Sequence, residues 1–290
     1  MSLLLQTPRA LLSRGVRRVT GAPSPLAGRV VMITGASSGI GEETALQVAL
    51  RGGHVVLVAR RADELERVRR AIEKAGGSAS AYACDLTNGP AVDVLVAEVL
   101  DQHGAIDYLV NNAGRSIRRS LDLAYDRIHD FERTMAINYI APVRLTMGLL
   151  PAMRAQRFGH VVNIVTWGIQ IKAPRYTAYI ASKAALDTWA RIAGRETWAD
   201  NVTFTNMRFG LVQTPMTAPT EAYAGRGETA QHAARRVVRA LEDRPVVVNT
   251  TLFARVCEVA NLVTPRLADH LGARGYRSSE DSSAARRHGA

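Results

Sequence analysis

The sequence has few of the residues that mark disulfide-rich, metal-binding or membrane-spanning proteins. Its two cysteines, Cys84 and Cys257, are too few for a disulfide framework and show no metal-ligand spacing with any histidine. We therefore expect no metal site, and a reducing cytoplasm suits this cysteine content. The longest apolar run, residues 252–263, is interrupted by Arg255 and Glu258 and falls short of the roughly 18 residues needed to cross a bilayer. The chain is not expected to span a membrane.

Lysine is scarce, although the chain is strongly basic. Lysine and arginine number 37 against 26 acidic residues, a net charge of +11, yet lysine occurs only at positions 74, 172 and 183. A charge of this size is compatible with a nucleic acid, an anionic membrane surface or a polyanionic small ligand, and it does not choose among them. The chain has no basic patch with interleaved aromatic residues, which argues against a nucleic-acid partner.

The two ends of the chain lack the pattern of a folded core. The first 29 residues contain five arginines and no acid, without the apolar stretch of about 7 to 15 residues that a secretory signal requires. We expect residues 1–25 to be a poorly ordered basic leader. Alternatively, they form an amphipathic segment that makes a cytoplasmic protein peripheral to the membrane, or an organellar transit peptide. The polar segment 277–290 is expected to be disordered, which leaves residues 26–276 as one domain.

Between these ends, apolar runs bounded by glycine or aspartate alternate with segments of helical period. Runs such as RVVMI and HVVLV are apolar on both faces, as parallel strands covered on both sides must be. The alternation predicts an α/β fold, a doubly wound Rossmann-type parallel sheet of about seven strands with helices on both faces. The tripeptide NGP at 88–90 supplies a cap residue and an early proline for a helix. The expected strands are residues 29–34, 54–59, 79–84, 107–111, 160–165, 202–208 and 245–249.

A glycine-rich segment, TGASSGIG from Thr34 to Gly41, follows the first expected strand and opens the first helix. Gly35, Gly39 and Gly41 allow a tight turn and let backbone N–H groups approach a pyrophosphate at the helix N-terminus, where the dipole favours anions. Such a motif is also compatible with an ordinary strand-to-helix turn. Its place after the first strand of a series of βα units favours a dinucleotide site.

Four motifs in this order resemble the short-chain dehydrogenase/reductase family, and the resemblance extends from about Leu26 to Asn249. They are TGASSGIG, CDLTN at 84–88, NNAG at 111–114, and a tyrosine and a lysine four residues apart, Tyr179 and Lys183. The resemblance implies a Rossmann-fold reductase in which CDLTN contacts the adenine and NNAG steadies the sheet beside the cofactor. The cofactor-binding residues that it implies are Gly35, Ser37, Ser38, Gly39, Ile40, Gly41, Asp85, Leu86, Asn112, Ala113, Gly114, Tyr179, Lys183, Val212 and Thr214.

The end of the second expected strand indicates which nicotinamide cofactor is used. An acidic residue there would accept hydrogen bonds from the ribose 2′-hydroxyl of NAD. Instead the strand runs into Arg60 and Arg61, and no acid occurs before Asp63. Two guanidinium groups suit the 2′-phosphate of NADP, to which they can donate charge-assisted hydrogen bonds. We expect NADP(H) to be preferred and NAD(H) to be possible; alternatively, both arginines are solvated surface charges.

Tyr179 and Lys183 lie at positions i and i+4 of an expected helix, so their side chains share one face. A free phenol has a pKa near ~10, too high for proton exchange at neutral pH, and we expect the Lys183 ammonium to lower the pKa of Tyr179. A solvated surface pair is the alternative. With three lysines in 290 residues, a lysine at this position has a chance of only about 1% on composition.

In the family, a serine thirteen positions before this tyrosine holds the substrate carbonyl oxygen, and Thr166 stands there in this chain. Threonine offers the same hydroxyl with an added methyl group, so we expect it to keep the role; otherwise it only ends a strand. Asn138 falls where the family has an asparagine that supports a water relay to the lysine, unless it merely bonds a backbone carbonyl. The family's Pro-Gly after the sixth strand reads Phe209-Gly210 here. The expected catalytic residues are Asn138, Thr166, Tyr179 and Lys183.

The segments that follow NNAG and the TPM tripeptide at 214–216 resemble the fatty acyl-CoA reductase branch of the family. This resemblance implies a small-molecule lipid substrate, a long-chain acyl-CoA that is reduced to fatty aldehyde with NADPH. Arg115, Arg118 and Arg119 stand just past the fourth strand, where they could receive the phosphates of coenzyme A or form a solvated basic loop. The apolar segment 252–263 is expected to pack on the sheet, or else to cover an acyl chain.

Two other functions remain open on the sequence alone. One is a ketoreductase that acts on a 3-oxoacyl, steroid or other lipid ketone. The other is a non-catalytic protein that binds NADPH or nucleic acid, against which the intact tyrosine and lysine argue. By analogy with the family, the chain is expected to form a homo-oligomer, either a dimer or a tetramer.

Overall fold

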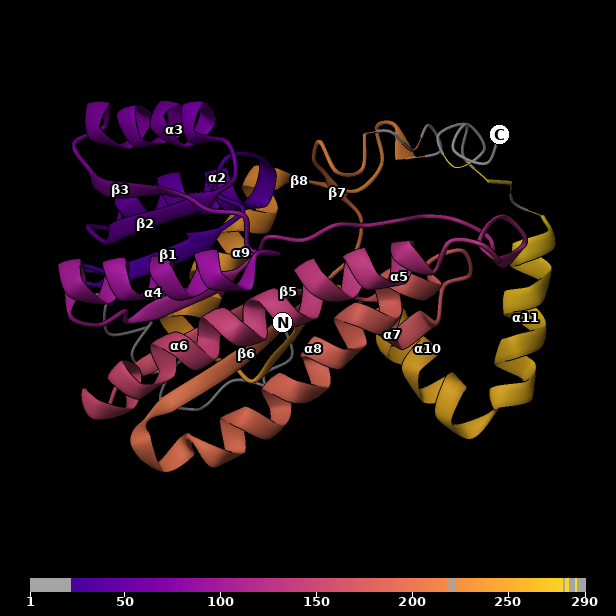
Figure 1. Cartoon of the computed structure of the whole chain (residues 1–290). Coiled ribbons are helices and arrows are strands. Elements are labelled where there is room, and N and C mark those ends of the chain that lie inside the picture. Colours follow the sequence, from indigo (N-terminus) through magenta and orange to yellow (C-terminus); the bar gives the residue numbers. More distant parts are fainter. Residues whose placement is uncertain (1–21, 219, 221–222, 279, 282–284, 286–290) are drawn as a thin grey trace.

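The computed structural model describes residues 22–218, 220, 223–278, 280, 281 and 285 of the chain. The strands of its main sheet are β1 (Val30–Thr34), β2 (His54–Ala59), β3 (Ser78–Ala83), β4 (Tyr108–Asn111), β5 (Gly159–Thr166), β6 (Val202–Phe209) and β9 (Val247–Asn249). They form a seven-stranded sheet in the order β3-β2-β1-β4-β5-β6-β9, and every neighbouring pair is parallel (Figure 1). The predicted doubly wound sheet is confirmed, and each strand begins and ends within two residues of its expected bounds.

Helices cover both faces of this sheet, because successive strand residues point to opposite sides. Ile33 and Leu57 belong to one apolar core, and Met32 and Val56 belong to the other. The first core is closed by α2 (Gly39–Ala49), α3 (Ala62–Lys74) and α9 (Ala230–Asp243). The second core is closed by α4 (Gly89–His103), α6 (Ala141–Ala155) and α8 (Thr177–Glu196).

The direction in which successive strands are added to the sheet reverses between β1 and β4. From β1 it proceeds through β2 to β3, and from β4 it proceeds through β5 to β6. At such a reversal the loops after neighbouring strands diverge and leave a crevice at the carboxyl ends of the strands, where ligands bind in sheets of this kind. The segments TGASSGIG and NNAG both start at this crevice.

The remaining elements connect the strands and helices of the two faces or extend from them. Asn88 caps α4 as predicted, since its side chain accepts a hydrogen bond from the N–H of Ala91. A turn of π-helix, Ala136–Ile140, connects two helices of the second face. The other elements are α5 (Ile128–Met135), α7 (Gly168–Ile171), α10 (Leu252–Val263), α11 (Pro265–Arg277), the short strands β7 (Val212–Gln213) and β8 (Glu228–Thr229), and 3-10 turns at Leu121–Leu123 and Trp198–Asp200.

Helix α10 contradicts the expectation that segment 252–263 packs its apolar residues on the sheet. Ala254 is the one buried residue of this helix, whereas large apolar side chains such as Leu252, Val256 and Leu262 are exposed. The reason is that polar residues of α10 bond the body of the protein and turn the apolar side outward. In Figure 1, α10 and α11 form a hairpin that extends beyond the end of the sheet.

The ends of the chain are described only in part. The predicted leader, residues 1–25, lies outside the described residues up to position 21. In the predicted tail, the Asp281 carboxylate accepts a hydrogen bond from the N–H of Ser120 (3.0 Å), and much of the rest is not described. In the described part of the chain, no helix is both long and apolar enough to cross a bilayer.

Candidate active site

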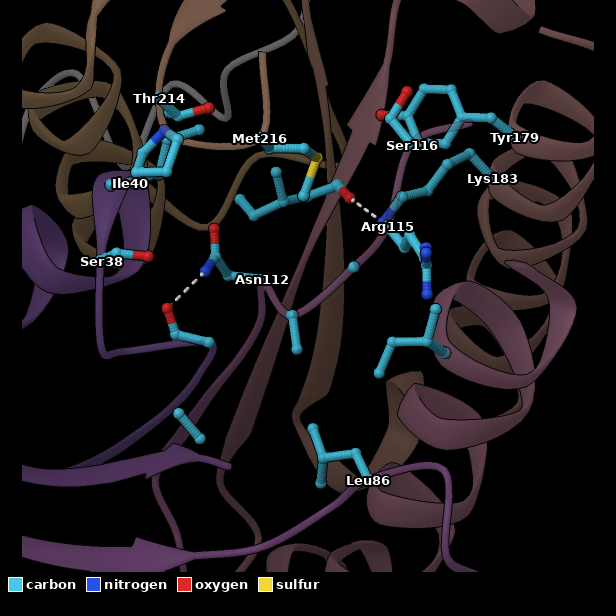
Figure 2. Close-up of a pocket in the computed structure, with 18 of the residues that line it drawn as sticks. Ser38, Ile40, Leu86, Asn112, Arg115, Ser116, Tyr179, Lys183, Thr214 and Met216 are labelled. Atoms are coloured by element: carbon cyan, nitrogen blue, oxygen red, sulfur yellow. Dashed lines mark hydrogen bonds between the residues drawn. The ribbon is translucent and has the colours of Figure 1, made fainter. Parts of the chain in front are cut away.

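Two large cavities lie side by side in the crevice and share part of their walls. Their volumes are about 1030 and 1050 Å³, and Thr166 and Tyr179 line both of them. The first cavity follows the glycine-rich segment, and the second extends toward α7 and the loop after β7. In Figure 2, Ser38, Ile40, Asn112 and Thr214 lie on one side of a pocket, opposite Ser116, Tyr179 and Lys183. The first cavity is lined by every predicted site residue except Gly41 and Asn138.

The glycine-rich segment is packed so closely that a side chain is excluded at Gly41. A Cβ atom built on Gly41 would lie 2.3 Å from the carbonyl oxygen of Gly35 and 2.6 Å from the side-chain nitrogen of Asn112. Helix α2 begins at Gly39, with Ser38 as its N-cap, so the first backbone N–H groups of the helix face the cavity that Ser37 to Ile40 line. This arrangement fits a dinucleotide pyrophosphate, which needs close backbone approach and free N–H donors.

Thr34 and Asn112 join the glycine-rich segment to the NNAG segment. The Thr34 hydroxyl accepts hydrogen bonds from the N–H groups of Asn112 and Ala113, both at 3.0 Å. The Asn112 side chain returns two bonds, to the carbonyl oxygens of Thr34 (2.9 Å) and Gly35 (3.3 Å). These bonds hold the ends of β1 and β4 in fixed relation, so NNAG has the steadying position expected for it.

The far end of the first cavity carries the groups expected to select the cofactor. Arg60 and Arg61 are exposed at the carboxyl end of β2 and line the cavity, and an Arg61 Nη lies 3.4 Å from the Ser37 hydroxyl. Asp85 accepts hydrogen bonds from the N–H and the hydroxyl of Thr87, which lower its pKa and keep it ionised. Two cations thus stand where an NAD-selective site would place an acid.

Thr166, Tyr179 and Lys183 come together where the two cavities meet. Thr166 ends β5 and its hydroxyl accepts a hydrogen bond from the N–H of Gly168 (3.1 Å), while Tyr179 and Lys183 lie one turn apart on α8. Lys183 is 4% exposed and its ammonium donates to the carbonyl oxygen of Ile164 (2.8 Å), the dashed contact beside it in Figure 2.

The pKa of Tyr179 moves in the direction opposite to the one expected. Burial raises it to about 12, and a hydrogen bond with Thr166 opposes this only in part. Burial also lowers the pKa of Lys183 to about 8. The low polarity of the site disfavours both charged forms, and this effect sets the direction of both pKa values. Tyr179 is therefore a neutral phenol at pH 7, the protonation state of a proton donor.

Asn138 is fully buried in the π-helical turn, behind the cavity wall. Its side chain donates to the carbonyl oxygen of Arg115 (2.8 Å) and to the hydroxyl of Ser182 (3.0 Å), and it accepts from the N–H of Arg115 (2.9 Å). A Cβ atom on Gly114 would lie 2.8 Å from the Asn138 side-chain oxygen and 3.3 Å from the Lys183 ammonium nitrogen. Asn138 thus holds the end of NNAG against Lys183.

The end of β6 and the segment that follows it line the first cavity. Phe209 extends β6 by pairing with Thr166, its ring joins the core, and its carbonyl oxygen accepts from the N–H of Trp167 (2.8 Å). A Cβ atom on Gly39 would lie 3.2 Å from the methyl carbon of Thr214. Phe209 is therefore a paired strand residue with a buried ring, and Thr214 of TPM lies against the glycine-rich segment.

The second cavity is lined by aromatic and aliphatic side chains together with several arginines and the acidic residues Asp130 and Glu228. The hydroxyls of Tyr176 and Tyr223 are hydrogen-bonded to each other. Arg119 is buried, with its Nε atom 3.2 Å from the Asp130 carboxylate, so it is neither a solvated loop residue nor an available phosphate ligand. Arg115 and Arg133 line both cavities. The lining residues include Ile117, Trp167, Ile171, Tyr176, Ile180, Leu211, Met216 and Tyr223.

Sequence reasoning missed several residues that shape the site. Ser182 links Asn138 to α8, since it donates to the carbonyl oxygen of Tyr179 (2.7 Å). Arg133 and Asp130 are ion-paired at the cavity rim, and Asp130 is buried. In the sequence, these residues were marked only by their position close to recognised motifs. The sequence could not show that they face the cavity, because packing decides which side of a helix does so.

Comparison with known proteins agrees with this geometry. A family described as short chain dehydrogenase matches residues 29–224. An uncharacterized oxidoreductase of Mycobacterium tuberculosis is 46% identical over 89% of this chain and 77% of its own. The chain is also similar to a fatty acyl-CoA reductase of Acinetobacter baylyi, with 42% identity over 89% of this chain and 88% of that one. A fatty acyl-CoA reductase of M. tuberculosis shows 45% identity over 83% and 81%.

Solved structures with the same fold include proteins described with either nicotinamide cofactor. A short-chain dehydrogenase from Streptomyces avermitilis has a TM-score of 0.73 at 27% identity, over 88% of this chain and 100% of its own. A 3-oxoacyl (acyl-carrier-protein) reductase from Agrobacterium tumefaciens with NADP bound has 0.69 at 27%, over 75% and 88%. A 3-ketoacyl-(acyl-carrier-protein) reductase from Brucella melitensis complexed with NADH has 0.71 at 24%, over 78% and 97%, and shares the fold.

Proposed function

The chain belongs to the short-chain dehydrogenase/reductase family, as its motifs predicted, and we propose that it reduces a long-chain fatty acyl-CoA thioester to the aldehyde with NADPH. The observation that carries this proposal is the meeting of two cavities at Tyr179 and Thr166. One cavity fits a dinucleotide, and the other is wide, lined with aromatic and aliphatic side chains and bordered by arginines. The second cavity thus suits a substrate with a long apolar chain and phosphate groups.

The preference for NADP(H) is supported by the charges at the end of β2. Arg60 and Arg61 can donate to a 2′-phosphate, and no acid stands beside them to accept from a ribose hydroxyl. The relation to solved structures does not choose between the cofactors, because they include complexes with each. NAD(H) is therefore the weaker second ligand in this proposal.

The residues at the junction have the properties that carbonyl reduction requires. A reduced nicotinamide in the first cavity supplies the hydride. Tyr179, a neutral phenol, donates its proton to the carbonyl oxygen as negative charge develops there, and the Thr166 hydroxyl holds that oxygen. Lys183 places its ammonium close to Gly114 and stabilises the phenolate that remains. Asn138 is a positioning residue that holds the NNAG segment and α8 in a fixed position relative to each other.

Thioester reduction requires one bond to form and one to break. Hydride adds to the carbonyl carbon and the Tyr179 proton goes to the oxygen, which gives a hemithioacetal. The oxygen then returns its proton to Tyr179 as the C–S bond breaks, so that the aldehyde is released, and the thiolate takes a proton from solvent. The balance is one acyl-CoA, one NADPH and one proton in, and one aldehyde, one free coenzyme A and one NADP⁺ out.

The arginines at the cavity rim support a coenzyme A substrate over a neutral ketone. Arg115 and Arg133 line both cavities, and Arg133 is ion-paired with Asp130, which also pairs with Arg119. Several cations share this single carboxylate, so the rim keeps a positive charge that phosphates would complement. The named relatives that share 42% and 45% identity with the chain point to the same substrate class.

A ketoreductase of 3-oxoacyl or other lipid ketones is the second candidate. It is supported by the solved 3-oxoacyl reductase of the same fold and by the same Tyr179 chemistry. A ketoreductase would stop at the alcohol after one hydride and release no thiol. A non-catalytic NADPH-binding protein is a third and weaker candidate, because it would not require the proton donor Tyr179 with Thr166 and Lys183 beside it.

The deciding experiment measures NADPH oxidation with palmitoyl-CoA while free thiol and aldehyde are quantified in the same samples. Equal amounts of NADPH consumed, thiol released and aldehyde formed would establish acyl-CoA reduction, and Tyr179→Phe should lower the rates of all three together by about 10²- to 10⁴-fold. NADPH oxidation with a 3-oxoacyl thioester but without thiol release would replace this proposal by the ketoreductase. Tight NADPH binding without turnover of either substrate would favour the non-catalytic protein.

A further inference from the structure

Helix α10 is oriented with its polar side toward the protein. The Glu258 carboxylate accepts hydrogen bonds from Gln170 (2.8 Å) and Arg208 (3.1 Å), and the Asn261 amide donates to the carbonyl oxygen of Gln170 (3.0 Å). Ala254 is the buried residue on this side. These contacts fix the rotation of the helix, and the side opposite to them must face outward.

The outward side of α10 is a continuous apolar stripe. Leu252, Val256, Val259 and Val263 follow one another at intervals of four, three and four residues, which places them on one face of a helix. Each of the four is at least 60% exposed, and Leu262 beside them is 82% exposed. Soluble proteins seldom leave a contiguous apolar surface of this kind in contact with water.

Helix α11 continues this surface and adds positive charge to it. None of its residues is buried, and Leu267 and Leu271 are exposed one turn apart. The helix is held to the body through Tyr276, whose hydroxyl donates to the Asp122 carboxylate (2.7 Å). The exposed basic residues of the hairpin are Arg255, Arg266, His270, Arg274 and Arg277, and its exposed acids are Asp269 and Glu258, of which Glu258 is paired with Arg208.

The positive charge beside the apolar stripe indicates which kind of partner covers it. An apolar helix face bordered by arginine is typical of a helix that lies in a membrane interface, where anionic headgroups meet the basic residues. A second copy of the chain would bring the same surface against itself and would place like charges together. We propose that the α10–α11 hairpin is a docking surface for an anionic phospholipid bilayer, with the stripe of Leu252, Val256, Val259 and Val263 immersed in it.

The hairpin adjoins the second cavity, which gives this docking a consequence for substrate access. Thr250 and Thr251 line that cavity, and α10 begins at the next residue. The ring of Phe253 packs against that of Trp167, another lining residue, with centroids 6.2 Å apart. A bilayer on the hairpin therefore meets the protein beside the cavity rim, where a lipid substrate would enter without crossing water.

The test is flotation of the full chain with vesicles of phosphatidylcholine alone and of phosphatidylcholine mixed with phosphatidylglycerol. The full chain is expected to float with the mixed vesicles and more weakly with the neutral ones. The triple variant Val256→Gln, Val259→Gln, Val263→Gln should bind at least about tenfold more weakly, because each immersed methylene strengthens binding roughly fourfold. The double variant Arg266→Gln, Arg274→Gln should lose the preference for anionic vesicles.

The matched control replaces one valine, one methionine and one isoleucine of similar exposure, each on a helix away from the hairpin. They are Val94 on α4, Met147 on α6 and Ile192 on α8, exposed by 58, 55 and 53%. Their joint replacement by glutamine should leave flotation unchanged. NADPH binding measured for every variant shows that the fold is intact. Since flotation requires no turnover, its outcome is independent of whether the protein reduces acyl-CoA.

Three outcomes would overturn the proposal. If the triple variant floats as strongly as the wild-type protein, another segment, such as the leader, binds the membrane. If the full chain does not float and the triple variant changes from dimer to monomer in light scattering, a second copy covers the stripe. If the full chain does not float and its oligomeric state is unchanged in the variant, the hairpin is not a docking surface for a bilayer.

Discussion

Replacement of Lys183 by methionine is expected to abolish reduction and, at neutral pH, to make the protein more stable. Lys183 is 4% exposed, and burial lowers its pKa from the ordinary 10.5 to about 8. At about 1.4 kcal/mol for each pKa unit, a protonated Lys183 makes the folded state less stable by roughly 3 kcal/mol at pH 7. Methionine has a similar unbranched shape and no charge, so this destabilising contribution disappears.

Part of that gain is offset by a lost hydrogen bond. The Lys183 ammonium donates to the carbonyl oxygen of Ile164, and an unpaired buried carbonyl costs about 1 to 3 kcal/mol. We therefore expect the free energy of unfolding at pH 7 to rise by roughly 1 kcal/mol. The size of this gain depends on how well the carbonyl of Ile164 finds another donor.

The pH dependence has a definite sign. Below pH 8 the lysine is protonated in both the folded and the unfolded chain, so the destabilisation by the buried charge is present in full. Between about pH 8 and 10.5 the folded protein loses this proton while the unfolded chain keeps it, so the wild-type protein gains stability as the pH rises. The advantage of the methionine variant must therefore shrink over this range.

The assay is urea unfolding of both proteins at pH 7 and pH 9, with NADPH oxidation measured in parallel. Lys74→Met, at an exposed position on α3, is the matched control and should change neither stability nor activity. A Lys183→Met protein that is less stable at pH 7 by the same amount as at pH 9 would refute the reasoning, since a buried charge would then not determine the stability of the site.

Three further predictions concern the cofactor and the proton donor. Tyr179→Phe should lower kcat by about 10²- to 10⁴-fold with a much smaller change in NADPH affinity, because the lost proton donor acts in the chemical step; stopped-flow turnover and fluorescence titration measure the two. The double variant Arg60→Ala, Arg61→Ala should lose about 10- to 100-fold in NADPH affinity and little in NADH affinity, since a charged hydrogen bond contributes about 1.5–3 kcal/mol. Equal losses for both cofactors would refute the assignment of the 2′-phosphate. Gly41→Ala should abolish binding of either cofactor, because its Cβ would lie 2.3 Å from the Gly35 carbonyl oxygen; calorimetric titration would detect any binding that remains.

The strands and the first cavity were predictable because both depend on local sequence. Strands buried on two faces require apolar residues at consecutive positions, and runs such as the one from Val30 to Thr34 therefore stand out. The glycine-rich segment was predictable for a related reason, since Gly41 has no space for a side chain. The carboxyl ends of parallel strands lie at one edge of the sheet, so the motifs that follow those strands had to converge.

The errors concern side chains whose surroundings come from distant parts of the chain. The spacing of Tyr179 and Lys183 correctly placed them on one face of a helix, but the direction of the Tyr179 pKa depends on how much water the packed site excludes. Arg119 looked like a loop residue and is buried against Asp130, because α5 folds back over the segment after β4. Neither result follows from a pattern of neighbours along the sequence.

The amino-acid sequence by itself determined the doubly wound sheet, the family and the identity of the residues at the carboxyl ends of the strands. Hydrophobic periodicity and glycine spacing extend over only a few consecutive residues, and both can therefore be recognised in the sequence alone. The tertiary structure alone decided the direction in which the pKa of Tyr179 shifts and the orientation of α10. The apolar residues of that helix predict burial, but Glu258 and Asn261 bond the body and turn them outward. Burial is a property of what surrounds a residue, and the surroundings are assembled only when the chain folds.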